Sequence, residues 1–256
     1  VGNLGNVTAT GLGTTFIKTN CEKYDISATT RVRVGEAIAI EPKVDAGDNH
    51  FIALKSNGEV YTWGYNAYGQ LGNGTSMNID TPTIVLGNDS HDITNQFEIT
   101  DAIDVSSGDQ FSLILREDGT VWSTGYNGYG QLGDGTTTNR TIFKPVKLNQ
   151  TGELLTNIIA ISAAEDTAYA LTAEGDVYTW GDNSYGELGQ NYTGSYVSYP
   201  VKMKNVSNIM KIEAGEDFVV MLDANGNVWA TGYNGNGQLG INNTTTQILP
   251  VKMLDT

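Results

Sequence analysis

Residues 47–72 read GDNHFIALKSNGEVYTWGYNAYGQLG. Two short β-prone runs, Phe51 to Lys55 and Glu59 to Trp63, flank the pair Asn57-Gly58. An Asn-Gly pair between such runs is a strong hairpin signal, because it supplies the positive φ that a tight turn needs. The run from Gly64 to Gly74 holds too many glycines for regular structure. The segment therefore predicts a β-hairpin followed by a loop.

The same pattern occurs four times along the chain. The turn at Asn57-Gly58 recurs as Asp118-Gly119, Glu174-Gly175 and Asn225-Gly226, and each following loop ends in G-x-L-G. The first glycines of these motifs, at positions 69, 130, 186 and 237, lie 51 to 61 residues apart. Repeats at a nearly constant spacing are the signature of solenoids and propellers.

Each repeat contains four predicted strands. A further strand, such as residues 103–105 or 159–161, leads into each hairpin, and no long helical pattern occurs. Four-stranded units repeated along a chain predict an all-β β-propeller, with four full blades and a partial N-terminal one. The last strand of each unit contains a proline, which we expect to be the first residue of an edge strand: Pro82, Pro145, Pro200 and Pro250.

The shared pattern of the repeats is G-x6-L-x3-G-x-V-x3-G-x-N-x2-G-x-L-G. It resembles the repeat of the regulator-of-chromosome-condensation family, and the composition of the chain favours a bacterial secreted or surface member. The resemblance covers residues 44–256 and implies a propeller of four-stranded blades. The founding members of that family have seven blades.

The chain divides into an N-terminal part and the repeats. Residues 1–43 are interpreted as a degenerate repeat or a strand-rich cap, with a strand at 6–11 and a hairpin around Gly35-Glu36. Odd repeats end their hairpins in Tyr-Thr-Trp-Gly, whereas even repeats end in Trp-x-Thr-Gly. The repeats are predicted at residues 44–100, 101–157, 158–208 and 209–256.

Four repeats and a partial one fall short of seven blades. An open array leaves a blade face uncovered at each end. Three explanations stay open: a smaller closed ring, a longer parent protein, or self-association in which chains complete one ring or stack end to end. The chain begins with Val1 and not with Met, which favours the longer parent.

The composition excludes several functions. The chain has 256 residues and a formal charge of −15, and such an acidic surface repels nucleic acid and anionic lipid. It contains no apolar run long enough for a membrane-spanning helix, so we predict no membrane insertion in this segment. One cysteine, Cys21, cannot form an internal disulfide. Charged residues make up only 17%, which is typical of extracellular or cell-surface proteins.

The search for catalytic groups gives little. The two histidines are His50, for which we expect a structural role near the central channel, and His91, expected to be exposed in a long insertion. Neither has the serine or cysteine motif that a hydrolase triad needs. Calcium-binding and phosphate-binding loop motifs are also absent, so we predict no enzyme activity, no cofactor and no metal.

Acidic residues recur where each hairpin begins. Asp48, Asp109, Asp166 and Asp217 occupy this place, next to Glu165 and Glu216 in the last two repeats. In a ring these carboxylates are expected to converge on one rim, where they could attract a basic partner or a cation. The simpler interpretation is turn chemistry, since Asp after Gly stabilises a turn.

Tyrosine and asparagine recur in the loops after the hairpins. Such side chains suit contacts with a protein or a glycan, because they combine rigid area with adaptable hydrogen bonding. The alternative is that they pack blade against blade. The candidate binding residues are Tyr65, Asn66, Tyr68, Tyr126, Asn127, Tyr129, Asn183, Tyr185, Tyr233 and Asn234.

The sequence therefore favours a non-enzymatic binding module of a secreted or surface bacterial protein, which recognises a protein or glycan through one propeller face. Two alternatives remain. The resemblance implies a regulator of another enzyme, since the founding member exchanges guanine nucleotide on a small GTPase and similar bacterial propellers inhibit β-lactamases. The open blade count allows a structural subunit of a surface assembly.

Overall fold

The computed structural model describes residues 13–21, 26–34, 40–89 and 94–254. The chain separates into two compact units, residues 1–39 and residues 40–256. Each is described by itself.

The first unit is an antiparallel hairpin of β1 (Gly13–Cys21) and β2 (Ile26–Val34), in which Gly13 lies opposite Val34. The strand predicted at 6–11 and the turn predicted at Gly35-Glu36 lie outside the described residues.

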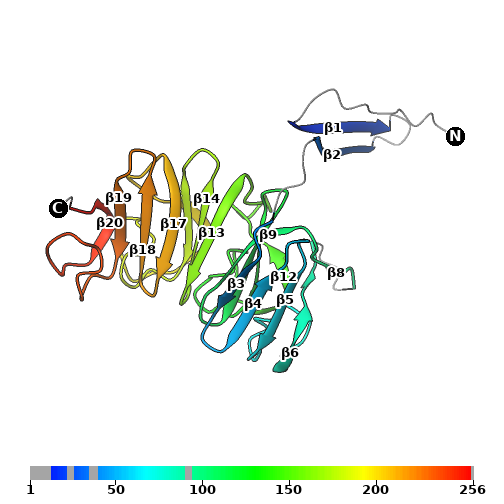
Figure 1. Cartoon of the computed structure of the whole chain (residues 1–256), viewed down its shortest axis with the longest axis horizontal. Helices are drawn as coiled ribbons and strands as arrows, with labels where there is room; N and C mark the ends of the chain where they lie inside the picture. The colour runs from blue at the N-terminus through cyan, green and yellow to red at the C-terminus, as the bar shows by residue number, and fades with distance from the viewer. Residues whose placement is uncertain (1–12, 22–25, 35–39, 90–93, 255–256) are drawn as a thin grey trace. The chain divides into compact units, whose positions relative to one another are not determined.

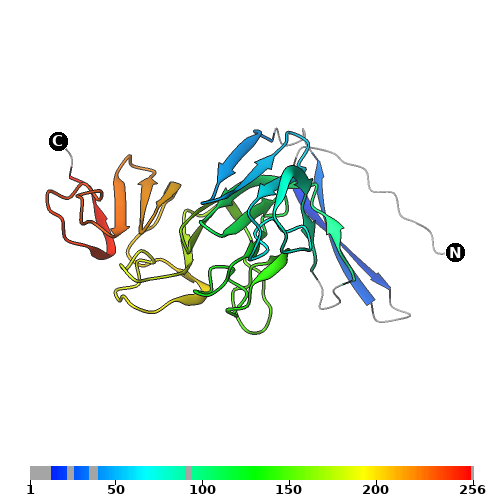
Figure 2. The same ribbon diagram turned by 90° about the horizontal axis from the view of Figure 1, so that it is seen from below.

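The second unit consists of consecutive sheets, antiparallel apart from one pair at the outer edge of the second, which we call blades 1 to 4 (Figures 1 and 2). Blade 1 contains β3 (Lys43–Ala46), β4 (His50–Leu54), β5 (Val60–Gly64) and β6 (Ile79–Ile84). Blade 2 contains β9 (Ala102–Ser107), β10 (Phe111–Arg116), β11 (Val121–Gly125) and β12 (Arg140–Pro145), and the short β7 (Leu86–Gly87) and β8 (Phe97–Glu98) extend its outer edge.

The last two blades repeat this order without the extension. Blade 3 contains β13 (Ile158–Ala164), β14 (Thr167–Thr172), β15 (Val177–Gly181) and β16 (Val197–Lys202). Blade 4 contains β17 (Ile209–Gly215), β18 (Phe218–Asp223), β19 (Val228–Gly232) and β20 (Gln247–Lys252). The all-β, four-stranded architecture predicted from the repeats is therefore confirmed.

The predicted hairpin turns form as expected. The glycine of each turn has a positive φ between 79° and 84°, at Gly58, Gly119, Gly175 and Gly226. A Cβ atom on Gly58 would lie 2.4 Å from the carbonyl oxygen of Thr100, so the turn also needs glycine for its close approach to the next blade's connection.

The proline prediction is wrong in position. Pro82, Pro200 and Pro250 are the fourth residues of six-residue outer strands, and Pro145 is the last residue of β12. None begins its strand. A proline inside an outer strand is tolerated because its missing N–H can face away from the neighbouring strand.

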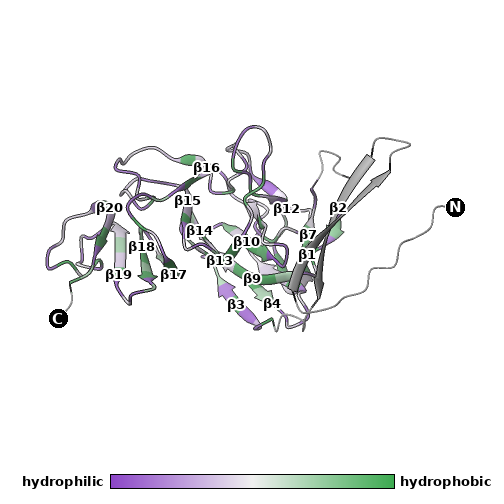
Figure 3. Ribbon diagram, turned by 90° about the horizontal axis from the view of Figure 1, so that it is seen from above, coloured by the Kyte–Doolittle hydropathy of each residue, from purple (hydrophilic) through white to green (hydrophobic). Residues whose placement is uncertain are grey.

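The apolar core lies between the blades. One buried cluster joins Ile52 and Val60 of blade 1 to Ile114 and Phe143 of blade 2. A second joins blades 2 and 3, and a third joins blades 3 and 4. Figure 3 shows hydrophobic colour concentrated on the strands. In β10 and β14 nearly every residue is buried, because these strands are covered on both sides.

In the second strands of blades 1 and 4, buried and more accessible side chains alternate. In β4, His50, Ile52 and Leu54 are buried towards blade 2, whereas the alternating Phe51 is 46% exposed. In β18 the pattern is reversed, because Val219 and Met221 face the core shared with blade 3. Among the described residues, no strand of blade 1 packs extensively against a strand of blade 4.

The antiparallel strands bring two kinds of connection to one end of each blade. The turn between β3 and β4 and the loop between β5 and β6 both lie at this end, and the backbone N–H of Tyr65 in the loop donates to the carbonyl oxygen of Asn49 in the turn at 2.8 Å. The same bond recurs between Tyr126 and Gln110. We call the surface formed by these turns and loops in all four blades the acidic face, for the residues described next.

Candidate functional site

The loop asparagines are buried and hold their own loops closed. The Oδ1 of Asn66 accepts the N–H of Leu71 at 3.0 Å, and its Nδ2 donates to the carbonyl oxygens of Thr75 and Met77 at 3.1 and 3.0 Å. Asn127, Asn183 and Asn234 are equally inaccessible and bond in the same way. The expectation that the asparagines contact a partner is therefore corrected, because their polar groups are satisfied inside the loop.

The loop tyrosines lie on the acidic face and contact one another. Within blade 1, the rings of Tyr65 and Tyr68 are 6.3 Å apart, and Tyr68 is 5.1 Å from Tyr126 of blade 2. Tyr126 in turn lies 6.3 Å from Tyr129. All of these are edge-on contacts, which are favourable for aromatic rings. The tyrosines thus pack blade against blade, and their rings also keep part of their surface exposed.

The tyrosine row is interrupted at blade 3. Asp182 takes the place that Tyr126 has in blade 2, so no ring pair joins blades 2 and 3 in the described residues. The row resumes where Tyr185 lies 5.0 Å from Tyr233 of blade 4. Tyr129 and Tyr185 on the two sides of the gap are 41% and 40% exposed. At this gap the carboxylate of Asp182 therefore takes the place of a ring, with the partly exposed Tyr129 and Tyr185 on either side.

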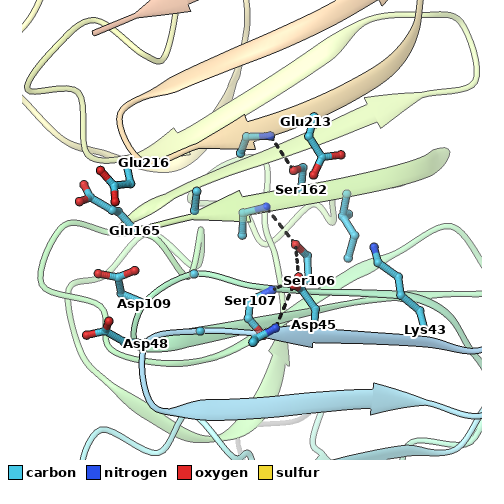
Figure 4. A pocket seen from close by; sticks show the side chains of 17 residues that line it. Lys43, Asp45, Asp48, Ser106, Ser107, Asp109, Ser162, Glu165, Glu213 and Glu216 are labelled. Carbon is cyan, nitrogen blue, oxygen red and sulfur yellow. Dashed lines mark hydrogen bonds between the residues drawn. The ribbon is translucent and has the colours of Figure 1, made fainter. Parts of the chain in front are cut away.

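The carboxylates at the hairpin entries form the inner part of the acidic face. Strand pairing aligns Asp48 and Asp109 with Glu165 and Glu216, two residues before each second strand. Asp166 and Asp217, which the sequence pattern grouped with Asp48 and Asp109, lie one residue later than the aligned position. In Figure 4 the four aligned side chains stand in a row along one side of the cavity.

Burial and neighbouring carboxylates raise the pKa values of two members of this row, Asp109 and Glu165. Desolvation, followed by the charges of Asp48 and Glu216, raises the pKa of Asp109. Desolvation and a hydrogen bond with Asp217 raise the pKa of Glu165, because the two carboxylates share a proton. Burial also raises the pKa of Asp166 to about 6, against a stabilising hydrogen bond from the Nε2 of Gln131.

One further carboxylate on this face was missed from the sequence. Glu187 occupies the variable place of the G-x-L-G motif, which is Gln70, Gln131 and Gln238 in the other blades. In each blade the side-chain oxygen accepts a backbone N–H two residues earlier, at 2.8 Å in the case of Glu187. Burial raises the pKa of Glu187 to about 7. The substitution of Glu for Gln was the available signal.

A cavity of about 430 Å³ lies beside the acidic row, between the innermost strands β3, β9, β13 and β17. Hydrogen bonds from blade to blade line it (Figure 4). Asp45 accepts the N–H of Ser107 at 2.9 Å, Ser106 accepts the N–H of Ala163 at 3.1 Å, and Ser162 accepts the N–H of Ala214 at 2.9 Å. These bonds fasten each blade to the next around the cavity.

The histidine expectations have separate outcomes. His50 is fully buried between blades 1 and 2, with its Nε2 2.9 Å from the hydroxyl of Ser112. Burial lowers the pKa of His50 to about 4, so the ring is neutral, as a structural role requires. His91 lies outside the described residues.

The described residues contain neither a metal-site geometry nor a membrane-spanning helix. No group of three or more His, Cys, Asp or Glu side chains there is arranged to hold a metal ion. The same residues include no helix with the length and apolar character needed to cross a bilayer.

Comparison with known proteins is consistent with this geometry. The family model of the RCC1-like domain matches residues 2–256. The chain is 32% identical over 211 residues to human "Probable E3 ubiquitin-protein ligase HERC4", covering 81% of this chain and 19% of that protein. It is 25% identical to human "E3 ubiquitin-protein ligase HERC2", covering 75% of this chain and 4% of that protein. The chain thus spans about a fifth or less of these relatives.

Solved structures show the same fold. Human WBSCR16 superimposes with a TM-score of 0.68 at 21% identity, over 88% of this chain and 56% of that chain. Yeast RCC1 (Prp20), in a complex with Kap60, superimposes with a TM-score of 0.67 at 21% identity, over 89% of this chain and 52% of that chain. The propeller resemblance of the repeats is therefore confirmed.

Proposed function

The chain belongs to the RCC1-like domain family, and we propose that it is a non-enzymatic protein-interaction module whose acidic face binds a basic segment of a partner protein. The observation that carries this proposal is the combination on one face of four aligned carboxylates with partly exposed tyrosines. Lysine and arginine side chains are attracted to both groups, by charge and by the faces of aromatic rings.

The arrangement favours an extended basic segment over a single cation. The carboxylates follow one another from blade to blade, at Asp48, Asp109, Glu165 and Glu216, and the tyrosines lie in two groups on the loops of the same face. Burial first, and neighbouring carboxylates second, raise the pKa values of Asp109 and Glu165. A basic segment would relieve the repulsion between neighbouring carboxylates and bring them back to their ionised form.

Related proteins support a protein partner. One solved structure of the fold is a complex of Kap60 with yeast RCC1, and another is described with its binding properties to Gsp1p and histones. The ligase activity named for HERC4 and HERC2 belongs to proteins of which this chain covers a small part. Regulation of a GTPase or inhibition of another enzyme is the second candidate, and the binding of a glycan is the third.

The test compares two labelled peptides of equal length, one rich in Lys and Arg and one rich in Asp and Glu, by fluorescence anisotropy. We expect binding of the basic peptide only, weakened by added salt because screening shortens the reach of exposed charges. Equal binding of both peptides, or of neither, would contradict the proposal. Glycan-array binding without peptide binding would favour the third candidate, and accelerated nucleotide release from a GTPase or a lowered β-lactamase rate would favour the second.

Variants locate the binding site. Replacing Tyr68 and Tyr129 with Ser is expected to weaken binding about tenfold, since each lost cation–π contact contributes about 0.5–1 kcal/mol. Asp109→Asn with Glu216→Gln should weaken it further and reduce the salt dependence. Glu153→Gln is the control, because it removes one charge from an exposed side chain on the connection at the opposite end of blade 2. Loss of cooperative unfolding in the tyrosine variant would show that the rings serve packing.

The extracellular and bacterial setting is part of this proposal and rests on composition. A low charged fraction of 17%, with abundant Asn, Thr, Gly and Tyr, supports it. Labelling intact source cells with a membrane-impermeant reagent tests it. Labelling of the protein only after lysis would contradict it.

A further inference from the structure

Two junctions between blades are joined on the acidic face by a pair of tyrosine rings. At the junction of blades 1 and 2, the rings of Tyr68 and Tyr126 are 5.1 Å apart, with an interplanar angle of 63°. At the junction of blades 3 and 4, the rings of Tyr185 and Tyr233 are 5.0 Å apart, with an angle of 61°. The two pairs therefore have nearly the same edge-on geometry, which each repeat can supply to its neighbour.

The junction of blades 2 and 3 has an aspartate in place of one ring. Tyr129 and Asp182 hold the positions there that Tyr68 and Tyr126 hold at the preceding junction. Among the described residues the only ring contact of Tyr129 is with Tyr126 of its own blade, and Tyr129 is more exposed than Tyr68. Since Asp is shorter than Tyr by a whole ring, a space of about that size opens here. We call the place bounded by Tyr129, Asp182 and Tyr185 the ring gap.

Hydrogen bonds fix the two sides of the ring gap relative to each other. The backbone N–H of Tyr129 donates to the Oε1 of Gln131 at 3.0 Å, and the Nε2 of Gln131 donates to the Oδ1 of Asp166 across the junction. The backbone N–H of Asp182 donates to the carbonyl oxygen of Asp166 at 3.0 Å. The Oδ2 of Asp182 accepts the N–H of Ser184 at 3.2 Å, whereas its Oδ1 accepts no hydrogen bond from the described residues. The gap therefore has ordered walls and one carboxylate oxygen that is available to a ligand.

Two further carboxylates, Asp166 and Glu187, lie in the turn and loop of blade 3 that form one side of the gap. Burial, followed by the charges of Asp109 and Asp182, raises the pKa of Asp166 to about 6. Burial, followed by the charges of Asp182 and Asp217, raises the pKa of Glu187 to about 7. All of these neighbouring charges are negative, so the field at the gap attracts a cation.

We propose that the ring gap binds the side chain of one arginine in the basic partner segment, with its guanidinium group beside the rings of Tyr129 and Tyr185 and paired with the carboxylate of Asp182. A guanidinium group is planar, stacks on aromatic rings and pairs with a carboxylate through two parallel N–H donors. A lysine ammonium has the same charge but neither the planar shape nor the paired donors. The inference rests on the proposed function, because it names the residue of the basic segment that the face selects.

An aromatic side chain of the partner fits the gap less well than arginine does. It matches the shape of the missing ring, but it covers the carboxylate of Asp182 without pairing with it. Burying a charge without a partner is costly. The charge of Asp182 therefore selects a planar cation over a neutral ring.

Fluorescence anisotropy with three labelled peptides and the whole chain tests the proposal. The peptides have equal length and the same outer lysines, and their central residue is Lys, Arg or Tyr. We expect the Arg peptide to bind about tenfold more tightly than the Lys peptide, through its contacts with two rings and its second hydrogen bond, and the Tyr peptide to bind most weakly. Equal binding of the Arg and Lys peptides, or tightest binding of the Tyr peptide, would overturn the arginine site and leave the proposed function standing. No binding of any peptide would overturn both.

Variants at Asp182 assign the preference to the ring gap. Asp182→Tyr restores the ring of the other blades and should bring the Arg and Lys peptides to within about twofold of each other, whereas Asp182→Asn should reduce the preference without filling the gap. Asp48→Asn is the matched control, because it removes the same charge from the acidic face in blade 1 and should weaken both peptides by a similar factor. A tenfold preference that survives in Asp182→Tyr would overturn the site.

Urea unfolding of Asp182→Tyr tests the size of the gap without any peptide. The new ring should contact Tyr129 edge-on, as Tyr126 contacts Tyr68, and should raise the midpoint of unfolding. A lowered midpoint, or a variant that does not fold by circular dichroism, would show that the space does not hold a ring and would overturn the proposal.

Discussion

Glu187 shows how one atom changes the response of the molecule to pH. Its place is glutamine in the other three blades, and burial raises the pKa of Glu187 to about 7. The folded protein therefore binds this proton more tightly than the unfolded chain does. The contribution of this group to the free energy of unfolding is fully present below its ordinary pKa of 4.5. It is lost as the pH rises through 7, where the carboxyl group of the folded protein gives up its proton.

We therefore predict that Glu187→Gln stabilises the protein by about 2 kcal/mol at pH 8 and has little effect at pH 4. The measurement is the free energy of unfolding by urea at both pH values. Glu153→Gln, an exposed side chain, is the control and should change neither value. An equal effect of Glu187→Gln at the two pH values would show that the carboxylate is not responsible.

Asn127 illustrates a residue whose role is packing. Its Oδ1 accepts the N–H of Leu132, and its Nδ2 donates to the carbonyl oxygens of Thr136 and Thr138. Asn127→Ala leaves the buried N–H of Leu132 unpaired, at a cost of about 1–3 kcal/mol, and removes the donor from two carbonyl groups whose hydrogen bonds are partly buried. We predict a loss of about 2–3 kcal/mol in thermal or urea unfolding. Tyr129→Ala should cost much less, because its ring is 41% exposed, and a comparable loss would contradict this division of roles.

At the scale of the element, the junction between blades depends on Trp180. Its indole is fully buried and donates to Gln131 of the preceding blade. Trp180→Phe keeps most of the apolar area but leaves that carbonyl group without its donor, so we expect a loss of about 1–2 kcal/mol. Trp229→Phe in blade 4, whose Nε1 bonds Asp223 within its own blade, is the matched comparison. Urea unfolding should show reduced cooperativity for the first variant only, and the same slope for both would contradict the role of the junction.

The strands and turns could be predicted because they depend on local signals. Asn-Gly and Asp-Gly pairs mark the hairpins, and period-two alternation marks the strands around them. The proline position could not be found in this way, since it depends on which edge of the outer strand faces a neighbour. Likewise, the register of the acidic row is fixed by the pairing of His50 with Gly64 and of Thr167 with Gly181.

Only part of the candidate site could be predicted from the sequence, for a related reason. Recurrence at a fixed place selects residues that every blade needs, and this property belongs to both packing and binding residues. Asn66 and Tyr68 recur together, yet one is fully buried and the other partly exposed. Departures from the repeat, such as Asp182 and Glu187, mark the acidic face more specifically than the repeat itself.

At the scale of the whole molecule, the stability of each blade depends on its neighbours. In a repeat array the total is close to a sum of unit and interface contributions, so a blade with one interface opens more often than a blade with two. Blades 2 and 3 have two interfaces, and blades 1 and 4 have one in the described residues. Amide hydrogen exchange at low concentration should therefore be slowest in β10, β11, β14 and β15. Exchange as slow in β4 and β19 as in β11 and β14 would contradict this order, because it would mean that the outer blades are protected as well as the inner ones.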